Sequence, residues 1–94
     1  MNELDFEWDV AKAIENYAKH GVSFEHAKLV FDDSFAIERV DDRVDYGEER
    51  FILVGLSQGF LLTVVYTERD DRIRLISARH ATRYEQDDYV EQNT

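Results

Sequence analysis

The sequence predicts an α+β fold in which helices pack on one antiparallel-rich sheet of about four to five strands. Three observations predict this class. Short segments show the alternating or continuous apolar pattern of strands, other segments combine helical spacing with capping residues, and short polar turns separate the last strands. The chain has 94 residues, 44% of them hydrophobic. This length falls in the range of one domain, so we expect residues 1–94 to form a single core.

The first predicted strand is Leu4–Trp8, where apolar and acidic residues alternate with the period of a half-buried strand. Phe35–Val40 is predicted as a second strand, and a polar loop follows it. Phe51–Leu56 is almost continuously apolar, as a strand buried on both faces would be. We therefore expect this third strand at the centre of the sheet.

Two further strands are expected to complete a meander. Gln58-Gly59 and Asp70-Asp71 are short turn sequences that delimit the strands Phe60–Thr67 and Arg72–Arg79. Simple alternation along the last strand puts its side chains on two faces. One face is expected to hold Ile73, Leu75 and Ser77, and the other Arg72, Arg74, Ile76 and Ala78.

Two helices are predicted near the N-terminus. Asp9 is a candidate N-cap for a helix over Val10–His20, and Gly21 suits the C-cap. The apolar stripe of this helix has helical spacing and comprises Val10, Ile14, Tyr17 and Ala18. Ser23 is a candidate N-cap for a second helix over Phe24–Phe31, whose apolar residues recur at spacings of three and four.

A third helix is predicted at the C-terminus. Thr82 and Glu85 match the capping-box pattern, in which the threonine hydroxyl accepts from the amide three residues on and the glutamate accepts from the cap amide. The pattern predicts a helix from Arg83 to about Gln92.

The charge distribution contains one local anomaly. The chain has a formal net charge of -10, yet the segment 72–84 (RIRLISARHATRY) holds four arginines and no acidic residue. A cationic island on an anionic surface attracts phosphate or carboxylate. The overall acidity argues against non-specific binding to nucleic acid, so any RNA contact is expected to be local.

Several classes of protein are excluded or disfavoured. The chain has no cysteine, which excludes disulfides and cysteine-based metal sites. Its first ten residues lack the pattern of a signal peptide, and no apolar run reaches the roughly 18 residues of a membrane span. We therefore expect a cytoplasmic protein with no membrane contact. The paired acidic residues have no ligand spacing with histidine, so no metal site is predicted.

Several longer runs of the sequence are distinctive in combination: FEWDVAKAIENYAKHGVSFEHAKLVFDD, GEERFILVGLS, LLTVVYTERDDRIRLISAR and the residues after it. Through these runs, which cover roughly Phe6 to Tyr89, the chain resembles the BrnT family of type II toxin–antitoxin toxins. The resemblance implies a RelE-like fold and an endoribonuclease that cleaves mRNA and needs no metal or other cofactor. It also implies a cognate BrnA-like antitoxin, which neutralises the toxin and alone contacts operator DNA.

Metal-free RNA cleavage needs a proton acceptor for the 2′-hydroxyl, a proton donor for the 5′-oxygen and cations around the phosphate. Arg79 and Arg83 are candidate phosphate ligands, because they flank the start of the last helix, where free amides add to anion binding. The alternative is that both arginines pair with carboxylates on the surface.

Two histidines are candidates for proton transfer, since imidazole ordinarily titrates near ~6.5. His80 lies inside the cationic segment; the alternative is an exposed histidine in a turn. His20 ends the first helix, where a histidine also complements the helix dipole without any further role. His26, within the second helix, is expected to be structural or exposed.

The resemblance adds three candidates for RNA binding: Lys19 as a phosphate contact, Trp8 as a base-stacking residue and Arg50 as a substrate contact. The alternatives are a core position for Trp8 and an ion pair with Glu48 or Glu49 for Arg50. We therefore expect an mRNA-cleaving toxin whose antitoxin covers the active face, with a basic segment drawn to its acidic flanks. The alternative function is a weakly active or inactive module that binds the antitoxin and tunes operon repression.

Overall fold

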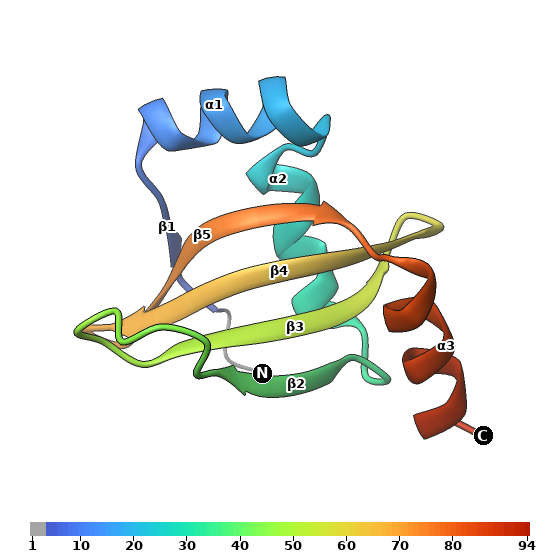
Figure 1. Ribbon diagram of the computed structural model, residues 1–94. Helices are drawn as coiled ribbons and strands as arrows, with labels where there is room; N and C mark the ends of the chain where they lie inside the picture. The colour runs from blue at the N-terminus through green and yellow to red at the C-terminus, as the bar shows by residue number, and fades with distance from the viewer. Residues whose placement is uncertain (1–3) are drawn as a thin grey trace.

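Five strands form one mixed sheet in the order β1-β5-β4-β3-β2. The computed structural model describes residues 4–94, and Figure 1 shows their α+β arrangement. The strands are β1 (Phe6–Glu7), β2 (Ile37–Asp41), β3 (Arg50–Ser57), β4 (Phe60–Arg69) and β5 (Arg72–His80). β1 runs parallel to β5, and every other pair is antiparallel. The predicted α+β class and the antiparallel-rich sheet are confirmed.

The helices are α1 (Val10–His20), α2 (Phe24–Ala27), the 3-10 helix η1 (Lys28–Asp32) and α3 (Arg83–Gln92). α2 and η1 lie against one face of the sheet, α1 lies along the β5 side, and α3 lies at the end where β5 finishes (Figure 1). None of the helices within residues 4–94 is long and apolar enough to cross a membrane.

The capping residues behave as predicted. Asp9 accepts a hydrogen bond from the amide of Lys12, Ser23 accepts one from the amide of His26, and Gly21 ends α1 with φ at 70°. Thr82 and Glu85 form the capping box of α3. The bounds predicted for the first and third helices are confirmed.

The second helix is shorter than predicted. The α-helix ends at Ala27, and the chain continues as the 3-10 helix η1 instead of reaching Phe31 as α-helix. Ala27 and Val30 are both fully buried and lie three residues apart. Three residues per turn is the period of a 3-10 helix, so this tighter winding directs both side chains toward the core.

The strand predictions need three corrections. The predicted strand Leu4–Trp8 is reduced to Phe6–Glu7, and Leu4 is 50% exposed. The predicted strand Phe35–Val40 is observed as β2, which begins two residues later at Ile37 and ends at Asp41; Phe35 precedes the strand and is exposed. Phe51–Leu56 lies within β3, which is buried on both faces as expected, but β4 occupies the centre of the sheet.

The two hairpin turns fix the register of the meander. Gln58 and Gly59 have positive φ, as do Asp70 and Asp71. Two positive φ values at the centre of a two-residue turn match the right-handed twist of the flanking strands. Ser57 therefore pairs with Phe60, and Arg69 pairs with Arg72.

A β-bulge in β5 overturns the predicted faces of that strand. Val65 pairs with Ser77 and Tyr66 pairs with Leu75, which leaves Ile76 as an extra residue. The side chains after the bulge therefore exchange faces. Ala78 is fully buried in the core with Leu75, whereas alternation alone placed them on opposite faces.

The hydrophobic core lies between the sheet and α2 with η1. It is built from the inward residues of the helices and of the three long strands, including Phe24, Val30, Leu53, Leu62, Val64 and Leu75. The opposite face, which we call the open face, is covered by α3 near one end. A hollow of about 60 Å³ between α3 and β2–β3 marks that covered part.

The apolar stripe of α1 points away from the core. Val10, Ile14 and Tyr17 are 69%, 67% and 59% exposed. The buried residue of this helix is instead the polar Asn16, with Ala13 packed against the edge of the core. α1 therefore turns a polar stripe toward the sheet and an apolar stripe toward solvent.

Candidate functional site

Arginines gather on the open face of the sheet. Residues paired across neighbouring strands share a face, and the register of β2 to β5 assigns six arginines to the open face. They are Arg39, Arg50, Arg69, Arg72, Arg74 and Arg79. The predicted cationic segment around β5 is thus part of a larger basic surface to which three other strands contribute.

Two adjoining hollows run between α1 and this face. The first, of about 250 Å³, is lined by Lys12, Glu15, Asn16, Lys19 and His20 of α1 and by Ile76 and Ser77 of β5. The second, of about 170 Å³, is lined by four cations, two carboxylates and two apolar residues: Lys12, Arg50, Arg69, Arg74, Asp9, Glu48, Leu75 and Ile76. Lys12 and Ile76 line both hollows, so the two lie next to each other, and we call them together the cationic groove.

Asn16 positions the helical wall of the groove. Its side-chain amide donates to the backbone carbonyls of Val22 and Ala78, both at 2.9 Å, and its oxygen accepts from the amide of Ala78 at 3.1 Å. Asn16 is buried, so these bonds are shielded from water. They tie α1 to β5 and place Lys12, Lys19 and His20 along the groove.

The groove cations differ in whether a carboxylate already holds them. Arg50 and Arg69 both pair with Glu48, at 3.2 and 3.3 Å. Arg74 and Arg72 both approach Glu7, at 2.9 and 3.8 Å. Lys12 and Lys19 form no ion pair with any carboxylate of residues 4–94.

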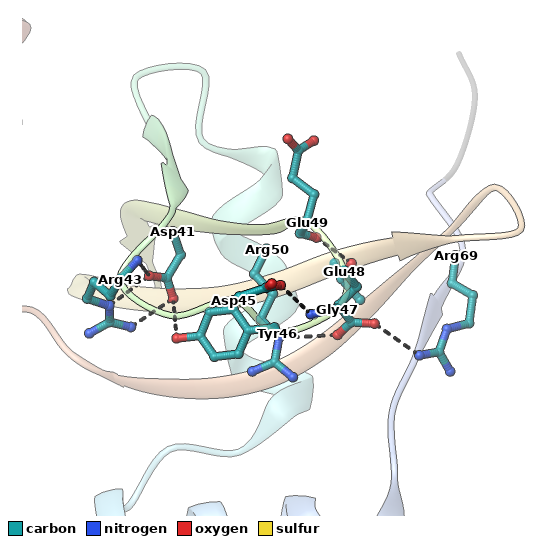
Figure 2. Close-up of polar contacts among 10 residues, drawn as sticks. Asp41, Arg43, Asp45, Tyr46, Gly47, Glu48, Glu49, Arg50 and Arg69 are labelled. Atoms are coloured by element: carbon teal, nitrogen blue, oxygen red, sulfur yellow. Dashed lines mark hydrogen bonds and ion pairs between the residues drawn. The ribbon is translucent and has the colours of Figure 1, made fainter.

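Arg50 is also held by the loop between β2 and β3. The guanidinium carbon of Arg50 lies 4.0 Å from the centroid of the Tyr46 ring and over its face, and the Tyr46 hydroxyl donates to Asp41 at 3.2 Å (Figure 2). Asp41 is buried and accepts two hydrogen bonds from the Arg43 guanidinium, at 2.7 and 2.8 Å. These hydrogen bonds, chiefly those from the Arg43 side chain, hold the pKa of Asp41 at about 2.

Arg79 is engaged by a buried carboxylate on α3. Its guanidinium donates to both oxygens of Glu85, at 2.7 and 3.0 Å, and Thr63 also donates to Glu85. Burial alone raises the pKa of Glu85, but the hydrogen bonds from Arg79, from the amide of Thr82 and from Thr63 outweigh it and hold the pKa at about 2. The Glu85 carboxylate therefore occupies the position beside the start of α3 where an external anion was expected.

Arg83 lies apart from this cluster. Its side chain is 88% exposed and pairs with Asp87 at 3.3 Å. Arg79 and Arg83 thus each hold a different carboxylate of α3. The ion-pair alternative considered for both residues describes their arrangement in this structure.

His80 lies on the other side of the sheet from Arg79. It pairs with the buried Leu62, and its ring lies 5.7 Å from the ring of Phe60. Phe60 in turn lies 6.1 Å from His26, whose Nε2 is 3.2 Å from the carbonyl oxygen of Ser57. Consecutive strand residues point to opposite faces, so the sequence neighbours Arg79 and His80 do not converge.

Trp8 is half-buried and packs edge-on against Phe24, with ring centroids 5.8 Å apart. It lines a mainly apolar hollow of about 420 Å³ together with Val10, Ile14 and Tyr17. The structure therefore brings Lys19, His20 and Arg50 to the cationic groove, and it places Trp8 beside the apolar stripe of α1.

Three cations of the groove are not among the candidates that the sequence suggests: Lys12, Arg69 and Arg74. The hairpin turn at Asp70-Asp71 contains a usable signal for two of them. It pairs Arg69 with Arg72, and alternation then puts Arg74 on the same face. Lys12 carries no such signal, because its position depends on how α1 docks on the sheet.

Among the residues that the structure describes, no three His, Asp or Glu side chains converge in a way that could hold a metal ion. Five lysine and arginine side chains line the groove against three carboxylates, and lysine and arginine bind anions.

The sequence of the chain matches one known protein family over most of its length. The sequence profile of the family described as the ribonuclease toxin, BrnT, of type II toxin-antitoxin systems matches residues 8–85. The chain belongs to this family. No curated protein matches the chain.

The cationic groove suits the class of substrate on which the BrnT family acts. The matched segment contains all the groove residues, from Asp9 to Ser77. A ribonuclease toxin acts on a polyanion, and lysine and arginine side chains supply the donors and positive charge that phosphates require. The BrnT family also implies an antitoxin partner and an RNA substrate.

Proposed function

We propose that this BrnT chain is an endoribonuclease that cleaves mRNA in the cationic groove without a metal ion. One observation carries the proposal: cations from α1 and from three strands line the two adjoining hollows of the groove, whose one histidine among the described residues is His20. In an otherwise acidic protein, such a concentration of positive charge focuses the electrostatic potential on the groove.

The reaction joins the 2′-oxygen of one nucleotide to the phosphorus while the bond from phosphorus to the 5′-oxygen breaks. The 2′-hydroxyl loses a proton and the leaving oxygen gains one. His20 is the groove residue best suited to transfer a proton, and Lys12 and Lys19 are free of described carboxylates and able to approach the phosphate. Arg50, Arg69 and Arg74 would bind the adjacent backbone.

Arg79 continues this row of cations. It lies on the open face two residues beyond Ser77 along β5, at the end of the groove nearest α3. For Arg79 to bind phosphate, its guanidinium would have to bind Glu85 and the phosphate together, or release Glu85 in favour of the phosphate. The roles of Arg83, His80 and Trp8 in RNA cleavage stay predictions, and their positions outside the groove make them secondary candidates.

A RelE-like architecture, a cytoplasmic location and a BrnA-like antitoxin complete this proposal. The antitoxin would neutralise the toxin and carry the DNA-binding part of the pair. The exposed apolar stripe of Val10, Ile14 and Tyr17 supports a protein partner, because contiguous exposed apolar surface is typical of interaction sites.

The same stripe favours the second candidate function, an inactive module that binds the antitoxin and tunes operon repression. The extensive ion pairing also supports this alternative, since seven arginines pair with carboxylates within residues 4–94.

The two functions are separated by incubating the purified chain with an mRNA transcript in the presence of EDTA. The ribonuclease proposal predicts cleavage that leaves 2′,3′-cyclic phosphate and 5′-hydroxyl ends. His20→Gln should lower the rate by at least about a hundredfold, the usual scale for loss of a general acid or base. The matched control is His26→Gln, which lies outside the groove. Absence of cleavage by the unmodified chain would leave the antitoxin-binding module as the better account.

A further inference from the structure

Glu48 is a single carboxylate shared by two groove arginines. Its Oε2 accepts from Nε of Arg50 at 3.2 Å, and its Oε1 accepts from a terminal nitrogen of Arg69 at 3.3 Å. Figure 2 shows Glu48 between these two side chains, which come from neighbouring antiparallel strands. Two guanidiniums converging on two oxygens of one negative charge is also the geometry of an arginine pair around a phosphodiester.

Arg50 does not depend on Glu48 for its position. The Tyr46 ring stacks against its guanidinium, and the hydroxyl of Tyr46 donates to Asp41, which Arg43 holds in turn (Figure 2). The Arg50 side chain is only 24% exposed. The loop thus keeps this guanidinium aimed into the groove whether or not Glu48 is bound to it.

The surroundings of Glu48 carry an excess of positive charge. Lys12, Arg50, Arg69 and Arg74 line the same hollow of about 170 Å³, against the carboxylates Glu48 and Asp9. Asp9 is occupied as the N-cap of α1, and Arg74 is paired with Glu7 from outside the hollow. Glu48 is therefore the carboxylate that neutralises the centre of the site.

We propose that Glu48 occupies the place of an RNA phosphate in the free protein, and that RNA binds this subsite by displacing it from Arg50 and Arg69. The inference rests on the proposed function and names one phosphate position within it. The hydrogen bond from Arg50 is the main cause that keeps the pKa of Glu48 below its usual range. Glu48 is therefore a charged competitor at neutral pH, and its partial exposure lets the side chain rotate into solvent.

Glu48→Gln tests this competition directly. The measurement is the affinity, at fixed salt, for a short oligoribonucleotide whose 2′-O-methyl groups prevent cleavage. The matched control is Glu49→Gln, because Glu49 is the exposed neighbour, its side chain forms no ion pair with a described residue, and both changes alter net charge by the same amount. Glu48→Gln should bind the oligonucleotide at least about threefold more tightly than Glu49→Gln. The gain in affinity corresponds to the two partly exposed ion pairs that RNA no longer has to break.

A second pair of variants locates the gain. Adding Arg69→Gln to Glu48→Gln should abolish the increase in affinity, and Glu48→Ala should reproduce it if the fold is kept, as judged by circular dichroism.

Equal affinities of Glu48→Gln and Glu49→Gln would overturn the inference, as would failure of Glu48→Gln to bind the oligonucleotide. Cleavage of unmodified RNA is scored separately. Cleavage with equal affinities rejects only the subsite, whereas tighter binding by Glu48→Gln without any cleavage rejects only the ribonuclease.

Discussion

Arg79 and Glu85 join the last strand of the sheet to the last helix through two hydrogen bonds of 2.7 and 3.0 Å. Glu85 also accepts from Thr63 on β4 and from the amide of Thr82. The buried Glu85 carboxylate thus accepts hydrogen bonds from β4, from β5 and from the N-cap of α3. These bonds fix α3 at one end of the open face. The same contact decides how available Arg79 is to RNA.

Glu85→Gln should lower the free energy of unfolding at neutral pH and flatten its dependence on acid. The folded-state pKa of about 2 lies below the ordinary glutamate value of ~4.3, so folding favours the charged form. This stabilisation, about 1 to 2 kcal/mol after allowing for the partly exposed Arg79, is complete above pH ~5 and is lost as pH falls toward about 2. Urea unfolding between neutral pH and pH ~3 measures it. Glu91→Gln, exposed on the same helix, is the control; a parallel pH profile for both variants would contradict the assignment.

Asn16→Ala should destabilise the chain by about 2 to 3 kcal/mol, because it leaves two carbonyls and one amide without their buried partner. Urea unfolding gives the free energy, and Glu15→Ala on the exposed neighbour is the control. Since Asn16 positions α1, RNA cleavage should fall as well, even at temperatures where the variant stays folded. A loss no larger than that of Glu15→Ala would show that Asn16 does not tie α1 to β5.

Gly55→Ala should destabilise the core by about 1 to 3 kcal/mol through overpacking. A Cβ atom at this position in β3 would lie 2.7 Å from Cγ1 of Val30 and 2.9 Å from Cβ of Ala36. Thermal unfolding of the variant measures the loss against Leu56→Ala, whose side chain is 45% exposed. An unchanged midpoint for Gly55→Ala would mean that η1 moves away from the sheet at little cost.

The parts of the fold that depend on local chemistry were predictable. Asp9, Ser23 and the Thr82–Glu85 box cap helices through bonds within a few residues, so their patterns identify the helix starts directly. The hairpin turns are local in the same sense. The exposed stripe of α1 was less informative, since periodicity shows that a stripe exists but not whether the sheet or a partner covers it.

The candidate site depended on contacts distant in sequence. The bulge at Ile76 arises from how β4 and β5 pair, and no feature of β5 alone marks it. The meeting of Lys12 with Arg50, Arg69 and Arg74 needs the docked helix and the finished sheet. The cationic segment 72–84 is a local charge anomaly, but its arginines separate in the fold. Arg79 points to α3, Arg74 to the groove, and Arg83 to solvent beside Asp87.

The rate of RNA cleavage by Lys12→Gln tests the central claim that the cationic groove is the catalytic surface. Lys12 lines both hollows and pairs with no described carboxylate, so its removal takes charge from the groove without breaking an ion pair. Lys28→Gln, on η1 and outside both hollows, changes the net charge equally. We predict a fall of at least about tenfold for Lys12→Gln and little change for Lys28→Gln. Equal rates for the two variants would contradict the assignment of cleavage to this groove.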